Sequence, residues 1–272
     1  MEIHFTKLHG NGNDFILIDE YERTVIPDEM KAEFAMLFCD RRFGIGGDGV
    51  LFLSRSDKAD LKMRLFQPDG SEAEMCGNGI RCLAKYAYDQ GNIRKSCTVE
   101  TLAGIIPVEC GYRDDTFFAR IRMPDPKFGR ADIPATGEGE YREQIGGVDV
   151  YAVNTGVPHA VVFVGDPDSV DVNALAPPIR HHPTFPKGAN VNFVGRSGKN
   201  ALRIRTFERG IEGETLSCGT GATAAAAVAH HLGYVDSPVE VETPGGPLSI
   251  ILSDGTWMEG PATTVFSGTI TF

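Results

Sequence analysis

The sequence has few basic residues for its acidic content and no long apolar run. It contains 26 lysine and arginine residues against 37 aspartate and glutamate residues, which gives a formal net charge of -11. Because so acidic a surface repels phosphate backbones and anionic lipid heads, neither nucleic acid nor a membrane surface is an expected partner. No apolar stretch approaches the length of a membrane span. The charged Glu2 and the absence of an apolar segment behind it predict no signal peptide.

Cysteine is also sparse, and no two cysteines are spaced as C-x-x-C. The six cysteines are too few for a disulfide scaffold in 272 residues, and their spacing does not predict a structural zinc site. The histidine pairs at 181–182 and 230–231 lack a partner four residues away, so we expect them to be solvated rather than metal-binding. These absences favour a protein with reduced thiols in the cytoplasm.

The chain does contain an internal repeat. Residues 72–79 and 214–221 share a glutamate, a cysteine and two glycines at a constant offset of 142, and the segments 99–104 and 241–246 match at the same offset. Similar alternating strands, at 62–67 and 203–208, precede the two cysteine blocks. A repeat of this length predicts one duplicated domain rather than a solenoid.

Each half is expected to contain a helix directly after its cysteine block. Ala-rich or apolar segments at 80–88 and 222–232 end near Gly91 and Gly233, which are typical helix-ending residues. Further strands are predicted at 15–18, 50–53, 161–164 and 191–194. One more helix is predicted at 28–39, with an apolar face formed by Met30, Phe34, Leu37 and Phe38.

These elements predict an α+β fold with two pseudo-symmetric lobes, each a mainly antiparallel sheet or barrel around a central helix. The expected N-terminal lobe comprises residues 1–119 and 264–272 and carries Cys76. The expected C-terminal lobe comprises residues 120–263 and carries Cys218. The segment 123–147, rich in Pro, Gly and Asp, is predicted to be a connection between the lobes.

Cys76 and Cys218 are the candidate reactive groups. A thiol at a helix start lies near unpaired backbone N–H groups and the positive end of the helix dipole, which favour the thiolate. The same N–H groups form an anion site suited to a carboxylate. The other four cysteines have no matched counterpart in the repeat, and we expect them to be buried thiols.

Two thiols of equal kind suit the inversion of a stereocentre. One removes a proton from one face of a carbon while the other delivers a proton to the opposite face. The developing charge would be stabilised by N–H groups at the helix starts. No lysine motif for pyridoxal phosphate is evident, so no cofactor is expected. A non-catalytic amino-acid binder remains an alternative, and a thiol redox protein is disfavoured because no resolving cysteine lies nearby.

Over its whole length the sequence resembles the diaminopimelate epimerase family. The resemblance is carried by the segments 7–15, 44–49, 68–72, 76–82, 156–159, 189–193 and 208–221, in this order and spacing. It implies the cofactor-independent interconversion of LL- and meso-2,6-diaminoheptanedioate in lysine biosynthesis, with no metal. It also implies a homodimer in which Phe266 occupies a position associated with the dimer contact. The alternative within this chemistry is another two-cysteine racemase, acting on proline, hydroxyproline or histidine.

The resemblance also implies roles for individual residues. Cys76 and Cys218 would be the acid/base pair, with His159 and Glu208 tuning protonation. The residues expected to bind the substrate are Asn13, Gln67, Gly77, Asn78, Asn190, Glu208, Arg209, Gly219 and Thr220, and the fork of Arg209 suits a carboxylate.

Structural roles for four of these positions remain open from the residues alone. Asn13, in a Gly-rich turn, also fits a left-handed backbone position. His159 also fits a satisfied polar residue at a strand start, and Glu208–Arg209 also fits a surface ion pair.

Two positions depart from the family pattern. Many members carry Asn where this chain has Gln67 and Val157. Gln67 keeps an amide on a longer stem, whereas the side chain of Val157 has no hydrogen-bonding group. Both departures concern the end of the substrate that does not react.

Overall fold

The computed structural model describes residues 2–272, which form two compact units. Unit 1 consists of the chain up to Ile121 together with Gly260–Phe272, and unit 2 consists of Arg122–Glu259. The segment predicted as a connection between lobes is part of unit 2. It contributes Ile133, Tyr141 and Ile145 to a buried apolar cluster, so that prediction was wrong.

Unit 1 is built mainly of strands. Its elements are β1 (Glu2–Gly10), β2 (Asn13–Asp19), α1 (Lys31–Phe38), β3 (Gly49–Ser54), β4 (Leu61–Phe66), β5 (Glu72–Ala73), α2 (Gly77–Asp89), β6 (Ser96–Thr101), β7 (Gly104–Arg113), β8 (Thr116–Met123) and β18 (Thr263–Thr271).

Unit 2 repeats this composition. Its elements are β9 (Arg142–Ile145), β10 (Val148–Asn154), β11 (Pro158–Phe163), α3 (Val172–Arg180), β12 (Asn190–Gly198), β13 (Ala201–Glu208), β14 (Gly213–Thr215), α4 (Gly219–His231), β15 (Val239–Thr243), β16 (Gly246–Ile251) and β17 (Thr256–Pro261).

The strands of the two units pair in the same order. In unit 1 the order is β18-β1-β2-β3-β4-β6-β7-β8, and in unit 2 it is β9-β10-β11-β12-β13-β15-β16-β17. Only the third and fifth pairings in each series are parallel. A helix lies in each of these parallel connections, as a parallel pair requires: α1 and α2 in unit 1, α3 and α4 in unit 2.

One helix is central in each unit. Helix α2 packs against β1, β2, β7 and β18, and α4 packs against strands β10 to β13 and β16. Nine residues of each helix are buried. The helices end in the same way, with Gly91 and Gly233 in the left-handed region at φ +77° and +71°. The predicted fold class, two similar α+β lobes around central helices, is confirmed.

The two smaller helices differ more from expectation. The predicted helix 28–39 is a 3₁₀ turn at Asp28–Met30 followed by α1. Phe34 is fully buried there, but Met30 and Leu37 are 36% and 51% exposed, so these two were wrongly assigned to its apolar face. Helix α3 was not predicted because Pro177 and Pro178 within it are poor helix-forming residues.

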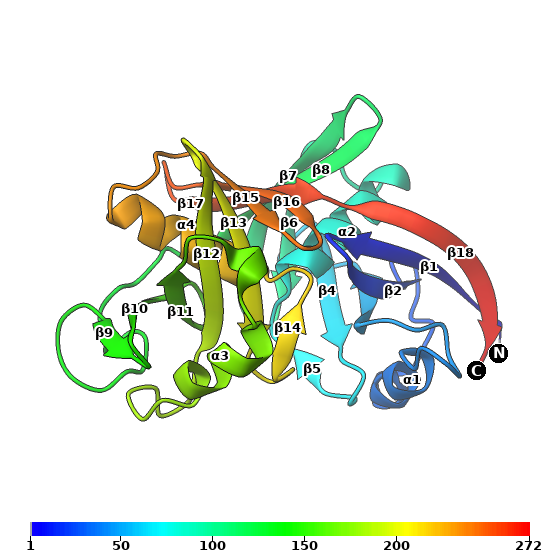
Figure 1. The fold of residues 1–272 in the computed structure, drawn as a ribbon. Coiled ribbons are helices and arrows are strands. Elements are labelled where there is room, and N and C mark those ends of the chain that lie inside the picture. The colour runs from blue at the N-terminus through cyan, green and yellow to red at the C-terminus, as the bar shows by residue number, and fades with distance from the viewer. Residues whose placement is uncertain (1) are drawn as a thin grey trace. The chain divides into compact units, whose positions relative to one another are not determined.

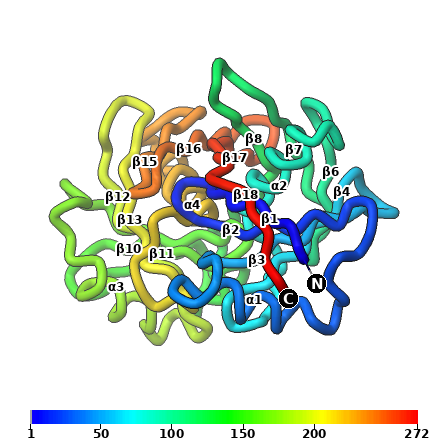
Figure 2. Tube along the Cα trace, turned by 90° about the vertical axis from the view of Figure 1, so that its right-hand side faces the viewer, coloured from blue at the N-terminus to red at the C-terminus, as the bar shows by residue number. Residues whose placement is uncertain are grey.

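The first and last strands of the chain lie side by side in unit 1. Strand β18 pairs antiparallel with β1 from Glu2↔Thr271 onward, and both views show the chain ends beside α1 (Figures 1 and 2). The ring of Phe272 meets that of Phe34 on α1 edge to face, at 5.2 Å between centroids. Within residues 2–272, no helix has both the length and the apolar content needed to cross a membrane.

Candidate functional site

Each candidate cysteine lies immediately before a central helix. Cys76 and Cys218 are the N-cap residues of α2 and α4, with extended backbones at φ -142° and -120°. Their carbonyl oxygens accept the first helical hydrogen bonds, both 2.9 Å long, from Ile80 and Ala222. The first-turn N–H groups that follow each thiol have no partner within the helix, as at any helix start. These groups belong to the predicted carboxylate-binding residues Gly77, Asn78, Gly219 and Thr220.

In unit 1, Asn13 lies beside the thiol of Cys76. The Cys76 Sγ donates to Asn13 Oδ1 over 3.6 Å, and Asn78 Nδ2 donates to the same oxygen over 3.1 Å. The Asn13 amide nitrogen donates to Asp48 Oδ2 over 2.7 Å. The residues with a left-handed backbone in this turn are Asn11, at φ +52°, and Gly12, at φ +80°, and not Asn13. Asn13 is therefore held with its carbonyl oxygen toward the cysteine.

Gln67, also predicted to bind the substrate, does not bond to Cys76 or Asn13. Its side-chain hydrogen bond goes to Ser71. It is exposed at the end of β4, and its Nε2 donates to Ser71 Oγ over 3.0 Å across the turn between β4 and β5. The main chain closes the same turn, since Gln67 N donates to Ser71 O over 2.8 Å.

In unit 2, a chain of hydrogen bonds leads from Asn192 through His159 and Thr220 to Cys218. Asn192 Nδ2 lies 3.1 Å from His159 Nδ1, and His159 Nε2 lies 2.9 Å from Thr220 Oγ1. Thr220 Oγ1 in turn lies 3.4 Å from Cys218 Sγ. All of these groups come from β11, β12 and the start of α4.

The donor order along this chain follows from its first member. The Asn192 amide nitrogen also donates to Ala160 O over 3.0 Å, which identifies it as the nitrogen. His159 Nδ1 must then accept, so the proton of the neutral ring is on Nε2 and is donated to Thr220. The hydroxyl proton of Thr220 is left for the Cys218 sulfur, an arrangement that favours the thiolate.

Burial keeps His159 neutral. The ring is fully buried, and burial, with the nearby positive charge of Arg209, lowers the pKa of His159 from 6.5 to about 3. Both ring nitrogens are hydrogen-bonded, so His159 is a satisfied buried histidine that also contacts Thr220 at the helix start.

Asn190, Glu208 and Arg209 form a second group in unit 2. Asn190 Oδ1 accepts from Arg209 N over 2.8 Å, and Asn190 Nδ2 donates to Pro158 O over 3.1 Å. Glu208 Oε2 accepts from Thr215 Oγ1 over 3.0 Å, while Arg209 Nη1 donates to two backbone carbonyl oxygens. Asn190 thus joins the backbone just before His159 to the backbone of Arg209.

The other cysteines lie in different environments. Cys39, Cys82 and Cys97 are buried, and burial raises the pKa of each thiol to about 12. The prediction of burial was wrong for Cys110, which is only partly buried and donates to Arg94 O over 3.4 Å. Burial raises its pKa to about 11, so all four stay protonated at neutral pH.

Asn192, Arg81 and the hydroxyl contacts of Thr220 were not predicted from the sequence. The signal for Asn192 is its spacing of two from Asn190, which places both amides on one face of β12. Arg81 is fully buried on α2, and its Nη2 donates to Asn11 Oδ1 over 2.7 Å in the turn before Asn13. Burial lowers the pKa of Arg81 to about 10.

No cluster of three or more metal-ligating side chains occurs among residues 2–272. The histidine pairs have other partners: His181 lies 3.4 Å from Glu212, and His231 lies 3.1 Å from Glu140.

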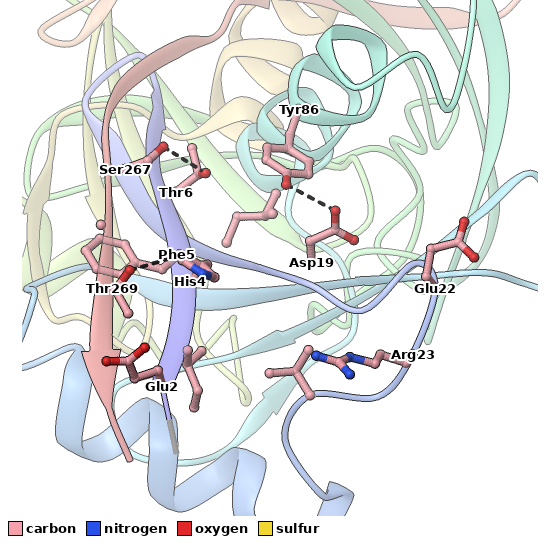
Figure 3. Close-up of a pocket in the computed structure, with 14 residues that line it drawn as sticks. Glu2, His4, Phe5, Thr6, Asp19, Glu22, Arg23, Tyr86, Ser267 and Thr269 are labelled. Atoms are coloured by element: carbon pink, nitrogen blue, oxygen red, sulfur yellow. Dashed lines mark hydrogen bonds between the residues drawn. The ribbon is translucent and has the colours of Figure 1, made fainter.

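Unit 1 also has a cavity away from Cys76. It has a volume of about 620 Å³ and lies along β1 and β18 (Figure 3). The hydrogen bonds drawn in it join Tyr86 to Asp19 and Thr6 to Ser267, both over 3.1 Å, and Thr269 to His4 over 3.0 Å. None of the predicted site residues lines this cavity.

Two comparisons with known sequences agree. The family model described as diaminopimelate epimerase matches residues 5–127 and 151–265. A protein named diaminopimelate epimerase from Methanothrix thermoacetophila is 58% identical over 271 residues, covering 99% of this chain and 96% of that protein. One of the same name from Archaeoglobus fulgidus is 49% identical, with 98% and 96% covered.

Solved structures with the same fold are far more distant in sequence. A phenazine biosynthesis protein of the PhzF family from Bacillus anthracis aligns with a TM-score of 0.74 at 17% identity, covering all of both chains. A probable proline racemase from Agrobacterium radiobacter aligns with a TM-score of 0.67 at 17% identity, covering 99% of this chain and 93% of the other. At such identities the likeness shows the fold alone, whereas the sequence matches cover nearly the whole chain: it belongs to the diaminopimelate epimerase family.

Proposed function

We propose that this protein interconverts LL- and meso-2,6-diaminoheptanedioate without a cofactor, using Cys76 and Cys218 as the acid/base pair. The observation that carries the proposal is the equivalent placement of two cysteines, each at the start of a central helix, in a chain 58% identical to a diaminopimelate epimerase. Thr220 and Asn13, which contact the two sulfurs, support it further.

In this mechanism the two thiols act on opposite faces of the same α-carbon. The thiolate of one cysteine takes the α-proton, and the electron pair left on carbon is delocalised into the α-carboxylate. The thiol of the other cysteine then gives its proton to the opposite face, which leaves the two cysteines with exchanged protonation states. N–H groups of Gly77, Asn78, Gly219 and Thr220 would stabilise the carboxylate charge.

The remaining predicted residues would serve the substrate and the thiols. His159 and Glu208 would tune protonation, and Asn13, Gln67, Asn190 and Arg209 would bind the amino-acid groups. We assign Arg209 to the distal carboxylate, since a guanidinium pairs well with that group. Gln67 and Val157 would set how tightly the distal end is held.

The first test follows the α-proton. The protein is incubated in D₂O with LL-diaminopimelate, and loss of the α-proton signal and formation of the meso isomer are followed by NMR. Proline, hydroxyproline and histidine are incubated in parallel. Exchange with one of these and none with diaminopimelate would overturn the proposed substrate.

Alanine variants separate catalysis from binding. Cys76→Ala and Cys218→Ala should each lower turnover by at least about 10²-fold, because each removes one proton-transfer group, and each should retain affinity for the substrate. Cys110→Ala is the matched control, since Cys110 lies on β7 and its thiol donates a hydrogen bond to Arg94 O. Turnover by either of the first two variants at the rate of the unmodified protein would refute the mechanism.

We further propose a cytoplasmic homodimer acting in lysine biosynthesis. Cys39, Cys82, Cys97 and Cys110 remain thiols, which suits a reducing compartment. Phe266, the position implied for the dimer contact, is 47% exposed on β18, next in sequence to Val265, which is 55% exposed. Exposed apolar neighbours of this kind are typical of an interface.

A further inference from the structure

The same ion pair precedes the candidate cysteine in each unit. On β4 and β5, Arg64 Nε and Nη2 donate to the two carboxylate oxygens of Glu72 over 2.7 and 2.9 Å. On β13 and β14, Arg205 Nε and Nη2 donate to the two oxygens of Glu214, both over 2.6 Å. Two parallel bonds from a planar guanidinium fix a carboxylate in direction as well as in distance.

The four side chains have nearly equal exposure. Arg64 and Glu72 are 24% and 21% exposed, and Arg205 and Glu214 are 21% and 23% exposed. The pairs are therefore partly shielded from water to the same degree. The two ion pairs thus match in their exposure to water as well as in their hydrogen bonds.

Each arginine also reaches a third segment. Arg64 Nη1 lies 3.0 Å from Asp28 Oδ1, in the 3₁₀ turn before α1. Arg205 Nη1 donates over 3.1 and 2.7 Å to the carbonyl oxygens of Pro167 and Val170, in and after the 3₁₀ turn before α3. Both arginines thus join their own strand, the short strand before the cysteine, and the turn before the neighbouring helix.

The glutamates are close to the cysteines along the chain. Glu72 lies four residues before Cys76, and Glu214 lies four residues before Cys218. The strands that carry them, β5 and β14, have only two and three residues, so few ladder bonds hold them. One further backbone bond is matched between the units: Ala103 N to Glu74 O over 3.1 Å, and Gly245 N to Leu216 O over 2.8 Å.

We propose that these ion pairs are positioning residues, Arg64–Glu72 for the thiol of Cys76 and Arg205–Glu214 for the thiol of Cys218. This proposal rests on the proposed function for its consequence in catalysis. A partly exposed ion pair adds little to folding stability, so the loss of one pair should displace the cysteine segment without unfolding the unit. Small misplacement of a reacting group lowers rates strongly, by roughly tenfold to a hundredfold.

Because each ion pair positions one thiol, breaking that pair should impair proton transfer at one face of the α-carbon. If the thiol that returns the proton is displaced, the carbanion lives longer, and the proton on the other thiol exchanges with D₂O. Deuterium then returns to the same face and appears in unreacted substrate. The stereoisomer that gains deuterium without inversion identifies which thiol is displaced.

The experiment uses Glu72→Gln and Glu214→Gln, with epimerisation in D₂O started from each stereoisomer in turn. Each variant should lower kcat/KM by about tenfold to a hundredfold, equally in both directions because the equilibrium constant is unchanged. Glu72→Gln should raise the ratio of exchange to inversion for one stereoisomer, and Glu214→Gln should raise it for the other. Glu109→Gln and Glu242→Gln, which break the pairs with Arg120 and Arg203, are the controls and should change neither quantity.

A second readout does not depend on the substrate. The alkylation rates of Cys76 and Cys218 by iodoacetamide, measured by mass spectrometry of the two peptides, should change for Cys76 in Glu72→Gln and for Cys218 in Glu214→Gln. The double variant Arg64→Glu, Glu72→Arg, which reverses the pair, should restore part of the rate.

The outcomes separate the two proposals. An unmodified protein that exchanges no α-proton of diaminopimelate contradicts the proposed function, while the alkylation pattern still decides the positioning role. If both glutamate variants alter the same stereoisomer, or alter the two cysteines alike, the positioning role is refuted. Unfolding temperatures of all variants are measured in parallel, and Arg64→Lys and Arg205→Lys replace the glutamine variants if either of these fails to fold.

Discussion

A hydroxyl group has one proton to donate, and the bond from His159 leaves the proton of Thr220 for the Cys218 sulfur. This order depends on Asn192, whose amide nitrogen is identified by its bond to Ala160 O. In unit 1 the group nearest the sulfur is different, since Asn13 presents a carbonyl oxygen that accepts from Cys76. The groups nearest the two sulfurs thus differ in kind, a hydroxyl beside Cys218 and an amide oxygen beside Cys76.

Removing the Thr220 hydroxyl should make the Cys218 thiolate less stable. A hydrogen bond to a charged group contributes about 1.5–3 kcal/mol, so Thr220→Val should raise the pKa of Cys218 and slow turnover at neutral pH by about tenfold or more. The pH dependence of Cys218 alkylation measures the change. Thr223→Val is the control, because its hydroxyl donates to Gly219 O on the same helix. An unchanged pH dependence in Thr220→Val would contradict the assigned donor order.

The lowered pKa of His159 predicts a loss of stability in acid. In the unfolded chain His159 binds a proton near pH 6.5, but in the folded protein it does so only near pH 3. Between these values the unfolded state holds more protons, so the free energy of unfolding falls as the pH falls, by up to about 1.4 kcal/mol per pH unit. Above pH 6.5 this contribution is fully present.

Chemical denaturation at pH 7.5 and pH 5.5 tests this expectation. His159→Gln should flatten the pH dependence by about 1 kcal/mol over this interval. His230, which is exposed near the end of α4, provides the control variant His230→Gln. This variant should leave the pH dependence of the unfolding free energy unchanged. Equal slopes for the protein and the His159 variant would show that the ring is not held neutral.

Sequence reasoning singled out the candidate reactive residues but not the residues that contact and surround them. Cys76 and Cys218 are repeated, so the duplication itself marks them. The contacts of Asn192, Arg64 and Arg205 join residues on different strands, and the sequence does not show which strands lie side by side. The loops before Glu72 and Glu214 also differ by one residue, which shifts the arginines to an offset of 141 and hides the matched pairs.

At the scale of elements, both central helices begin three residues earlier than predicted. Helices α2 and α4 start at Gly77 and Gly219, whereas the sequence predicts starts at 80 and 222. Glycine has low helix propensity, so the first turns carry no sequence signal. Packing within each unit stabilises these turns instead. Because glycine has no side chain, other groups can come close to the backbone beside the thiol.

The two helix starts should tolerate a methyl group differently. A Cβ at Gly221 would lie 2.5 Å from Asn192 Oδ1 and 3.3 Å from Cys218 Sγ, whereas a Cβ at Gly79 would lie 3.2 Å from the flexible end of Leu51. Alanine gains about 1 kcal/mol of helix propensity at either site, but overpacking costs about 1–3 kcal/mol. Gly221→Ala should therefore lose both stability and activity, and Gly79→Ala should be close to neutral in stability.

Urea denaturation and the epimerisation assay measure these two variants side by side. Gly79→Ala acts as the matched control, because it occupies the equivalent helix position in the other unit. Equal losses for both variants would indicate that helix geometry in general, and not the contact with Asn192, limits substitution at these starts.

At the scale of the whole molecule, the repeat in the sequence predicted the architecture well. The same strand order, the same two parallel pairings and the same central helix occur in both units, and each follows from duplication. The segment 123–147 could not be assigned correctly, because its polar residues resemble a linker while its few apolar ones, such as Ile133 and Tyr141, are buried in unit 2. Scattered apolar residues give no periodic signal.

The proposed homodimer is tested by the mass of the protein in solution. Phe266→Arg places a charge at an exposed apolar position on β18 and should convert the dimer into a monomer in sedimentation equilibrium at micromolar concentration. Val148→Arg, at an exposed position on β10 in unit 2, is the control. An unmodified protein with the monomer mass at all concentrations would refute the dimer.

The pairing of β18 with β1 has a consequence for synthesis on the ribosome. Unit 2 is one continuous stretch, so every residue it needs has been translated once the chain passes Glu259. Unit 1, although most of it emerges first, waits until Thr263–Thr271 has been translated before β1, already paired with β2, gains its second neighbour β18. Until then the free side of β1 is an uncovered strand edge, the form in which chaperones and aggregation compete for a new chain.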